Sequence, residues 1–145
     1  MDNKSQGHMV ESMFDVEAMK LGLGVAIPVG DNYPFDRIVI VGQQLIRIQI
    51  KSTNQISRDK RNGPGQSTSY RFNTSNTLSK KPYTKDDCDF ICCFIIPLNR
   101  WYIFPVEAVS VRNIRVYPHD FHSLNEYKEA WQLIKHFNKK ESMVQ

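Results

Sequence analysis

Four polar residues in the first part of the chain have the types that metal-dependent phosphate chemistry needs. They are Glu11, Asp36, Gln49 and Lys51. Asp36 begins the run 36–41, and Gln49 and Lys51 close the run 45–51. Carboxylate and amide oxygens suit a hard cation such as Mg²⁺, and an ammonium group can stabilise the charge that builds on a reacting phosphate. These side chains would suit phosphodiester hydrolysis if the fold brings them together.

The two runs are predicted to form a β-hairpin. Both are rich in β-branched residues, which is typical of strands, and Gly42 between them can supply the positive φ that a tight turn needs. A turn centred on Gly42 and Gln43 pairs Asp36 with Gln49. Residues two apart on a strand share a face, so Lys51 lies on the side of Gln49. The sequence therefore predicts an acid, an amide and an amine on one face at one end of the hairpin.

These residues also carry a resemblance to a known family. Asp36 followed by Gln49-Ile50-Lys51 resembles the PD-(D/E)XK nuclease motif, with glutamine where a second acid usually stands. The string 7–11 is similar to the helix that gives this superfamily an extra acid, here Glu11. Further matching strings, in order, are 25–32, Pro34-Phe35-Asp36, 47–53, 82–90 and 101–105. Together they resemble the PD-(D/E)XK family of group I intron-encoded homing endonucleases, of the cyanobacterial type.

The resemblance implies a fold and a role for each residue. The expected fold class is α/β, a restriction-endonuclease-like core whose mixed β-sheet is flanked by helices. Asp36 is expected to be the central ligand of Mg²⁺, with the Gln49 side-chain oxygen and the Ile50 carbonyl completing the protein ligands. Glu11 would bind a second metal or orient a water, and Lys51 would hold or deprotonate the attacking water. An amide carries no charge, which leaves the number of metals open.

The size of the chain predicts a single domain over residues 1–145, which the resemblance implies is an endonuclease domain. The chain is 41% hydrophobic, enough for a modest core, and lacks an apolar run near the roughly 20 residues that span a membrane. The N-terminus does not resemble a secretory signal, and the three cysteines fit reduced thiols in a bacterial cytoplasm. The sequence contains no Walker motif or glycine-rich dinucleotide loop, so no nucleotide cofactor is expected.

Basic residues are concentrated in one segment. Residues 51–85 contain eight lysines and arginines and one acid, a net charge of +7, within a chain whose net charge is +4. A DNA-contacting insertion over about 53–85 is therefore expected, with strand-like alternation at 68–74 and a ribbon tip near Gly63-Pro64-Gly65. A solvated charged face is the alternative. The expected DNA contacts are Arg58, Lys60, Arg61, Gln66, Ser67, Ser69, Arg71, Asn73, Lys80, Lys81 and Lys85.

The remaining pattern predicts the elements around the hairpin. A helix is expected over about 5–21 and a short strand over 25–27. The apolar run 88–96 predicts a buried strand that pairs with 100–104, and 109–111 and 114–116 are shorter strand candidates. A capping box at 123–126 predicts a helix that buries Tyr127, Ala130, Trp131, Ile134 and Phe137.

A zinc site built from the cysteines and nearby histidines is a weaker alternative. Cys88, Cys92 and Cys93 with His119 and His122 supply suitable ligand types. The cysteine spacing differs from that of zinc knuckles, and a cysteine within a buried strand commonly serves as a small apolar residue.

The expected activity is a Mg²⁺-dependent double-strand break at a long, approximately palindromic DNA site. Because one active site cuts one strand, a homodimer or a homotetramer is expected on double-stranded DNA. A Holliday-junction resolvase and a catalytically inactive DNA-binding module are the alternatives. Gln49 keeps the inactive module open, whereas the basic segment favours sequence readout over junction binding.

Overall fold

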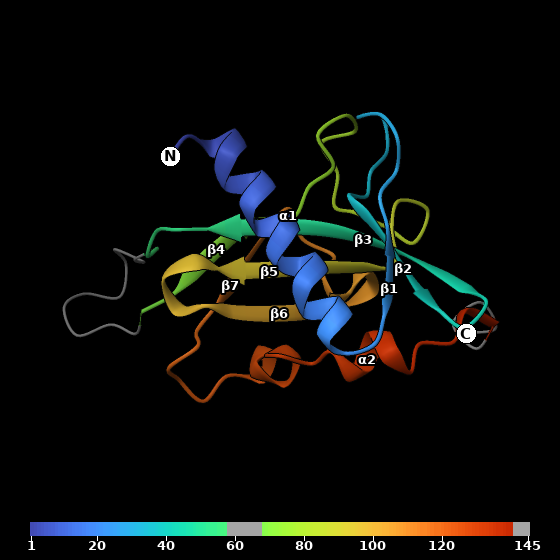
Figure 1. The fold of residues 1–145 in the computed structure, drawn as a ribbon. Helices are drawn as coiled ribbons and strands as arrows, with labels where there is room; N and C mark the ends of the chain where they lie inside the picture. Colours follow the sequence, from blue (N-terminus) through green and yellow to red (C-terminus); the bar gives the residue numbers. More distant parts are fainter. Residues whose placement is uncertain (58–67, 141–145) are drawn as a thin grey trace.

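The computed structural model describes residues 1–57 and 68–140 (Figure 1). Its helices are α1 (Asn3–Lys20) and α2 (Gln132–Lys135), with short 3-10 helices η2 (Ile96–Leu98), η3 (Val106–Ala108) and η4 (Ser123–Tyr127). Its strands are β1 (Gly24–Ala26), β2 (Arg37–Val41), β3 (Gln44–Thr53), β4 (Tyr70–Asn73), β5 (Phe90–Ile95), β6 (Arg100–Pro105) and β7 (Asn113–Val116). Among the described helices, none is long and apolar enough to cross a membrane.

A mixed five-stranded sheet forms the centre of the fold. Its order is β1-β2-β3-β5-β6, with β3 and β5 parallel and the other neighbours antiparallel. The helix α1 crosses one face of this sheet (Figure 1). It begins where the Asp2 carboxylate accepts a hydrogen bond from Ser5 N, and it ends before Gly22, whose φ is +78°. The α/β class, the mixed sheet and the first helix predicted from the sequence are confirmed.

Strand alternation creates a core on each face of the sheet. Phe90, Cys92 and Phe94 of β5 point to the side that α1 and α2 cover. Their neighbours Ile91 and Cys93 point to the opposite side, where they form a second core with the small sheet β4-β7. The continuous apolar run of β5 is explained by this burial on both faces.

The basic segment is more integrated than predicted. A strand does form within 68–74, but β4 pairs with β7 rather than with the residues before the ribbon tip. An isolated bridge pairs Ser69, just before β4, with Ser57. The predicted tip at 63–65 lies outside the described residues. Because Tyr70, Phe72 and Tyr83 belong to the second core, residues 68–85 are part of the fold and do not project as a free insertion.

Two predictions for the second half of the chain are wrong. Residues 109–111 follow η3 and form no strand. The single helix predicted from residue 123 is divided into η4 and α2, with Glu129 between them at a φ of +51°. The Glu129 carboxylate accepts hydrogen bonds from Trp101 N at 2.8 Å and Trp131 Nε1 at 2.9 Å. The bond to Trp101 in the edge strand β6, with a second from Glu129 N to the Trp101 carbonyl at 2.8 Å, outweighs the local preference for helix.

Candidate active site

The hairpin that carries Asp36 has the predicted register. Arg37 pairs with Ile48 and Val41 with Gln44, so continuing the ladder by one residue places Asp36 opposite Gln49. Asp36 N donates to the Ile48 carbonyl at 2.8 Å, and one carboxylate oxygen accepts from Ile50 N at 3.0 Å. Two hydrogen bonds to β3 therefore fix both the backbone and the side chain of Asp36.

Gln49 and Lys51 lie on the face of β3 that is directed to the second core. In the sheet they lie beside Ile91 and Cys93 of β5, which face that core. Gln49 is only 8% exposed, and its amide nitrogen lies 3.5 Å from the Ile50 carbonyl. The Lys51 ammonium lies 5.4 Å from the centre of the Tyr83 ring, within the range of a cation–π contact. The Gln49 amide and the Lys51 ammonium therefore share one face of β3.

Arg37 of β2 links the acids of helix α1 to the site, and the sequence analysis did not identify this arginine. Arg37 is 8% exposed and makes a two-pronged contact with Asp15, at 2.7 and 3.2 Å. It also donates to the Asp36 carbonyl at 2.8 Å and lies 4.0 Å from a Glu11 carboxylate oxygen. Arg37 shares its face with buried Val39, and a charged residue at such a core position was the available signal.

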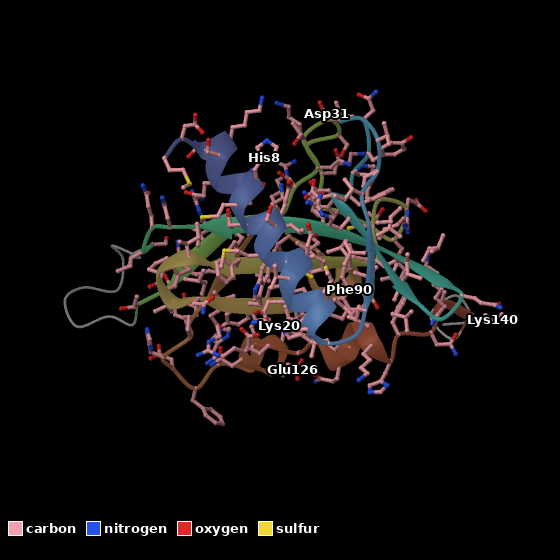
Figure 2. The ribbon with its side chains drawn as sticks, viewed as in Figure 1. His8, Lys20, Asp31, Phe90, Glu126 and Lys140 are labelled. Carbon is pink, nitrogen blue, oxygen red and sulfur yellow. The ribbon has the colours of Figure 1, made fainter. Side chains whose placement is uncertain are left out.

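Two adjoining cavities meet at Asp36. The larger, of about 540 Å³, is lined by Asp36, Gln49 and Lys51 together with parts of the loops 31–34 and 76–78. The smaller, of about 430 Å³, is lined by Asp36, Glu11 and Arg37. Two of its further lining residues, His8 and Asp31, are labelled at the same end of the molecule in Figure 2. The four predicted catalytic residues therefore line two cavities that share Asp31, Tyr33 and Asp36.

Burial shapes the electrostatics of this region. Burial raises the pKa of Asp36, although the bond from Ile50 N and the positive charges of Lys51 and Arg37 oppose this shift. Burial also raises the pKa of Glu11, and repulsion from Asp36 adds to it. The pKa of Lys51 is lowered, again mainly by burial, with Asp36 acting in the opposite direction. The two carboxylates are thus partly desolvated and repel each other, a cost that a cation between them would relieve.

The donor set fits an oxygen-seeking divalent cation. Asp36, Glu11, the Gln49 amide oxygen and the Ile50 carbonyl all supply oxygen, which Mg²⁺ prefers. Within the described residues no three histidine, cysteine or acidic side chains form a metal-binding cluster, so a cation bound here would also need the amide and backbone carbonyl oxygens. Rotating the Gln49 side-chain amide by about 180° would exchange its nitrogen and oxygen. The amide oxygen and the Ile50 carbonyl oxygen would then lie on the same side, as binding one cation requires.

The expected DNA contacts fall into three groups. Arg71, Asn73, Lys80, Lys81 and Lys85 are exposed. Ser69 is 1% exposed and its hydroxyl donates to the Ser57 carbonyl at 2.6 Å, so this hydroxyl holds two chain segments together and does not face a groove. The remaining residues, Arg58, Lys60, Arg61, Gln66 and Ser67, lie outside the described residues.

The pairing of β4 with β7 adds polar residues that sequence reasoning did not connect to DNA. Arg71 lies directly opposite Arg115, and Asn73 lies opposite Asn113. Tyr70, Phe72, Ile114 and Val116 face the core, so these two pairs lie on the outer face of the small sheet. Arginine and asparagine are the side chains that most often recognise guanine and adenine edges.

The three cysteines are core residues. Cys88, Cys92 and Cys93 are all buried. Burial raises the pKa of the Cys88 thiol to about 12 and holds those of Cys92 and Cys93 above the ordinary value. His122 is engaged elsewhere, since its ring accepts a hydrogen bond from Leu124 N and packs on Tyr117. The cysteines therefore serve as small apolar residues in β5 and just before it.

Comparison with solved structures extends the likeness of the fold to the whole chain. A bacterial homing endonuclease, I-Ssp6803I, superposes with a TM-score of 0.76 over 99% of each chain, at 23% sequence identity. Hjc, a Holliday junction resolvase from Archaeoglobus fulgidus, gives a TM-score of 0.47 at 16% identity, covering 84% of this chain and 95% of that chain. The second score is too low to support an argument. No curated protein matches the sequence.

The sequence pattern that describes one family matches most of the chain. That family is described as PD-(D/E)XK endonuclease, and the match covers residues 1–134. The matched range includes α1, the hairpin, the parallel pair β3-β5 and both cavities. Because this match covers most of its length, the chain belongs to the PD-(D/E)XK endonuclease family, with Gln49 in place of the usual second acid of the motif.

Proposed function

We propose that this protein is a site-specific homing endonuclease that makes Mg²⁺-dependent double-strand breaks in a long, approximately palindromic DNA target. The observation that carries the proposal is the meeting of Asp36, Gln49 and Lys51 at one end of the hairpin, in one cavity. Family membership supports the endonuclease activity, and the likeness of fold to a bacterial homing endonuclease supports the narrower assignment.

The proposed roles follow from the chemistry of each side chain. Asp36, the Gln49 amide oxygen and the Ile50 carbonyl hold the metal, and Glu11 binds a second metal or orients a water. When bound, a divalent cation neutralises charge on the scissile phosphate and lowers the pKa of a water that it holds. The Lys51 ammonium, supported by the Tyr83 ring, lies in the same cavity and stabilises the phosphate as the phosphorus–oxygen bond breaks.

The side chains that line the two cavities carry a net negative charge. Glu11, Asp31, Asp36 and Asp87 supply four negative charges, Arg37 and Lys51 supply two positive charges, and Gln49 adds none. This balance attracts a divalent cation, and phosphate oxygens of the substrate would add further ligands to it.

DNA binding is proposed to involve basic residues in and near the turn that carries part of the cavity lining, and polar residues on the outer face of the small sheet β4-β7. Lys80, Lys81 and Lys85 suit phosphate contacts, whereas Arg71 and Asn73, with Arg115 and Asn113 opposite, suit base edges. Arg58, Lys60, Arg61, Gln66 and Ser67 remain proposed contacts from the sequence. Because each site cuts one strand, we expect the chain to act as a homodimer or homotetramer on a target of approximate two-fold symmetry.

Cleavage of a plasmid library with mapped ends tests the proposed function. Discrete double-strand breaks are expected with Mg²⁺, and they should be absent with Ca²⁺ or with a chelator. The Asp36→Asn variant, purified in parallel, controls for a contaminating nuclease. Cutting of four-way junctions in preference to any linear site would indicate a resolvase instead. Tight DNA binding without cutting in Mg²⁺ or Mn²⁺ would indicate an inactive binding module.

Restoring the missing acid should change metal binding. We expect Gln49→Glu to bind Ca²⁺ about tenfold more tightly, because a carboxylate replaces a neutral ligand opposite Asp36. Without metal the same variant should unfold at a lower temperature, since another carboxylate is buried beside Asp36. Titration calorimetry and thermal unfolding with and without Ca²⁺ measure the two effects.

Gln43→Glu is the matched control, because Gln43 is exposed at the distant turn of the same hairpin. It should leave Ca²⁺ affinity unchanged. An equal affinity for Ca²⁺ in Gln49→Glu and in the parent protein would exclude Gln49 from the metal's surroundings.

A further inference from the structure

An exposed leucine stands at the rim of the catalytic cavity. Leu78 is 87% exposed, and it lines the cavity that Asp36, Gln49 and Lys51 also line. Its turn lies beside the loop that precedes β2 (Figure 1), and residues of both segments line the cavity. Because Leu78 packs against neither core, its side chain contributes little to the stability of the fold.

The turn that carries Leu78 is held in one conformation by its own hydrogen bonds. Asn76 N donates to the Lys81 carbonyl and Lys80 N donates to the Asn76 carbonyl, both at 2.8 Å. The Asn76 side chain accepts from Leu78 N at 3.0 Å and donates to Asp87 at 3.2 Å. A bridge between Ser75 and Pro82 closes the base of the turn. The leucine is therefore presented on a fixed support, which reduces the entropy lost on binding.

The surroundings of Leu78 indicate what it would meet. Exposed Lys80 and Lys81 follow it in the same turn and suit two phosphates of a DNA strand. On the facing loop, Tyr33 is 54% exposed and lines the same cavity, so Leu78 and the Tyr33 ring border the cavity from two sides. Many proteins that bind the minor groove insert an apolar side chain such as leucine between two base steps, and they also use lysine and arginine there.

We infer that Leu78 is a wedge that inserts between base pairs from the minor groove, next to the phosphate held at Asp36 and Lys51. This inference rests on the proposed endonuclease function and adds a device that positions the scissile phosphate. Insertion loses the free energy of stacking between two base pairs and gains that of burying the leucine. Contacts of the neighbouring lysines with phosphates offset the difference. The local unstacking lets the backbone bend into the cavity.

The test uses a duplex selected from randomised DNA by binding to the full chain in Ca²⁺, with 2-aminopurine placed in turn at each step around its centre. We expect fluorescence at one or two steps to rise several-fold on binding the parent protein, because the probe loses its stacking partner. Leu78→Ala should abolish the rise and change affinity by less than about tenfold, since lost burial and regained stacking oppose each other. Leu78→Met should retain the rise.

Leu45→Ala is the matched control, because Leu45 is also largely exposed but lies near the turn of the hairpin. It should behave as the parent protein. A bound duplex that shows no rise, or a rise that persists in Leu78→Ala, would overturn the wedge while leaving the endonuclease proposal intact. Failure to select any bound duplex would instead overturn the proposed function, and the wedge with it.

Discussion

Asp36→Asn should reduce the rate of DNA cleavage by at least about 10³-fold, because the metal loses its central charged ligand and with it several kcal/mol of transition-state stabilisation. The substitution is nearly isosteric, and an asparagine oxygen can still accept the hydrogen bond from Ile50 N. Single-turnover cleavage in Mg²⁺, with DNA affinity measured separately in Ca²⁺, separates chemistry from binding. We expect the affinity to change far less than the rate.

The folded state should tolerate this substitution. Burial raises the pKa of Asp36, so the ionised carboxylate is less stable in the folded protein than in water, and the neutral amide removes that cost. The unfolding temperature without metal should therefore be equal or higher. Asp31→Asn is the control within the same cavity, and it should change the cleavage rate by no more than about threefold. Near-normal cleavage by Asp36→Asn would remove Asp36 from the proposed metal site.

Arg37→Met should lower the free energy of unfolding by about 3 kcal/mol. The guanidinium holds Asp15 by two hydrogen bonds and the Asp36 carbonyl by a third, and removing one partner of a largely buried ion pair leaves the other uncompensated. The value is at the lower end of the usual range because Asp15 retains 23% side-chain exposure. For a chain of this size the unfolding midpoint should fall by roughly 6–12 °C.

Lys20→Met provides the matched control for the arginine. Lys20 pairs with Glu17 at 3.4 Å on the exposed side of α1, where an ion pair contributes little. Its loss should change stability by less than about 0.5 kcal/mol. Combining Arg37→Met with Asp15→Leu should recover much of the lost stability, because the carboxylate that the guanidinium holds by two hydrogen bonds is removed with it. Equal unfolding midpoints for Arg37→Met and the parent protein would contradict the structural role of the arginine.

The local part of the site was predictable from the order of the residues. Strand propensity on both sides of Gly42, which has a φ of +60°, defined a tight hairpin, and the turn fixed the register. Once register and the two-residue period of a strand were known, the relation of Asp36, Gln49 and Lys51 followed. Helix α1 and the buried pair β5-β6 were also predictable, because their patterns repeat over many residues.

The contacts between distant segments could not be predicted from local patterns. The exposed and buried faces of β4 were visible in the sequence, but its partner β7 lies some forty residues further along the chain, and pairing across that interval has no local signal. The break at Glu129 likewise arises from hydrogen bonds to Trp101 on another strand. Glu11 could be proposed from a short string, whereas its support by Arg37 depends on how α1 crosses the sheet. Local preferences fix turns and periods, whereas burial and long-range hydrogen bonds choose among the pairings that those preferences leave open.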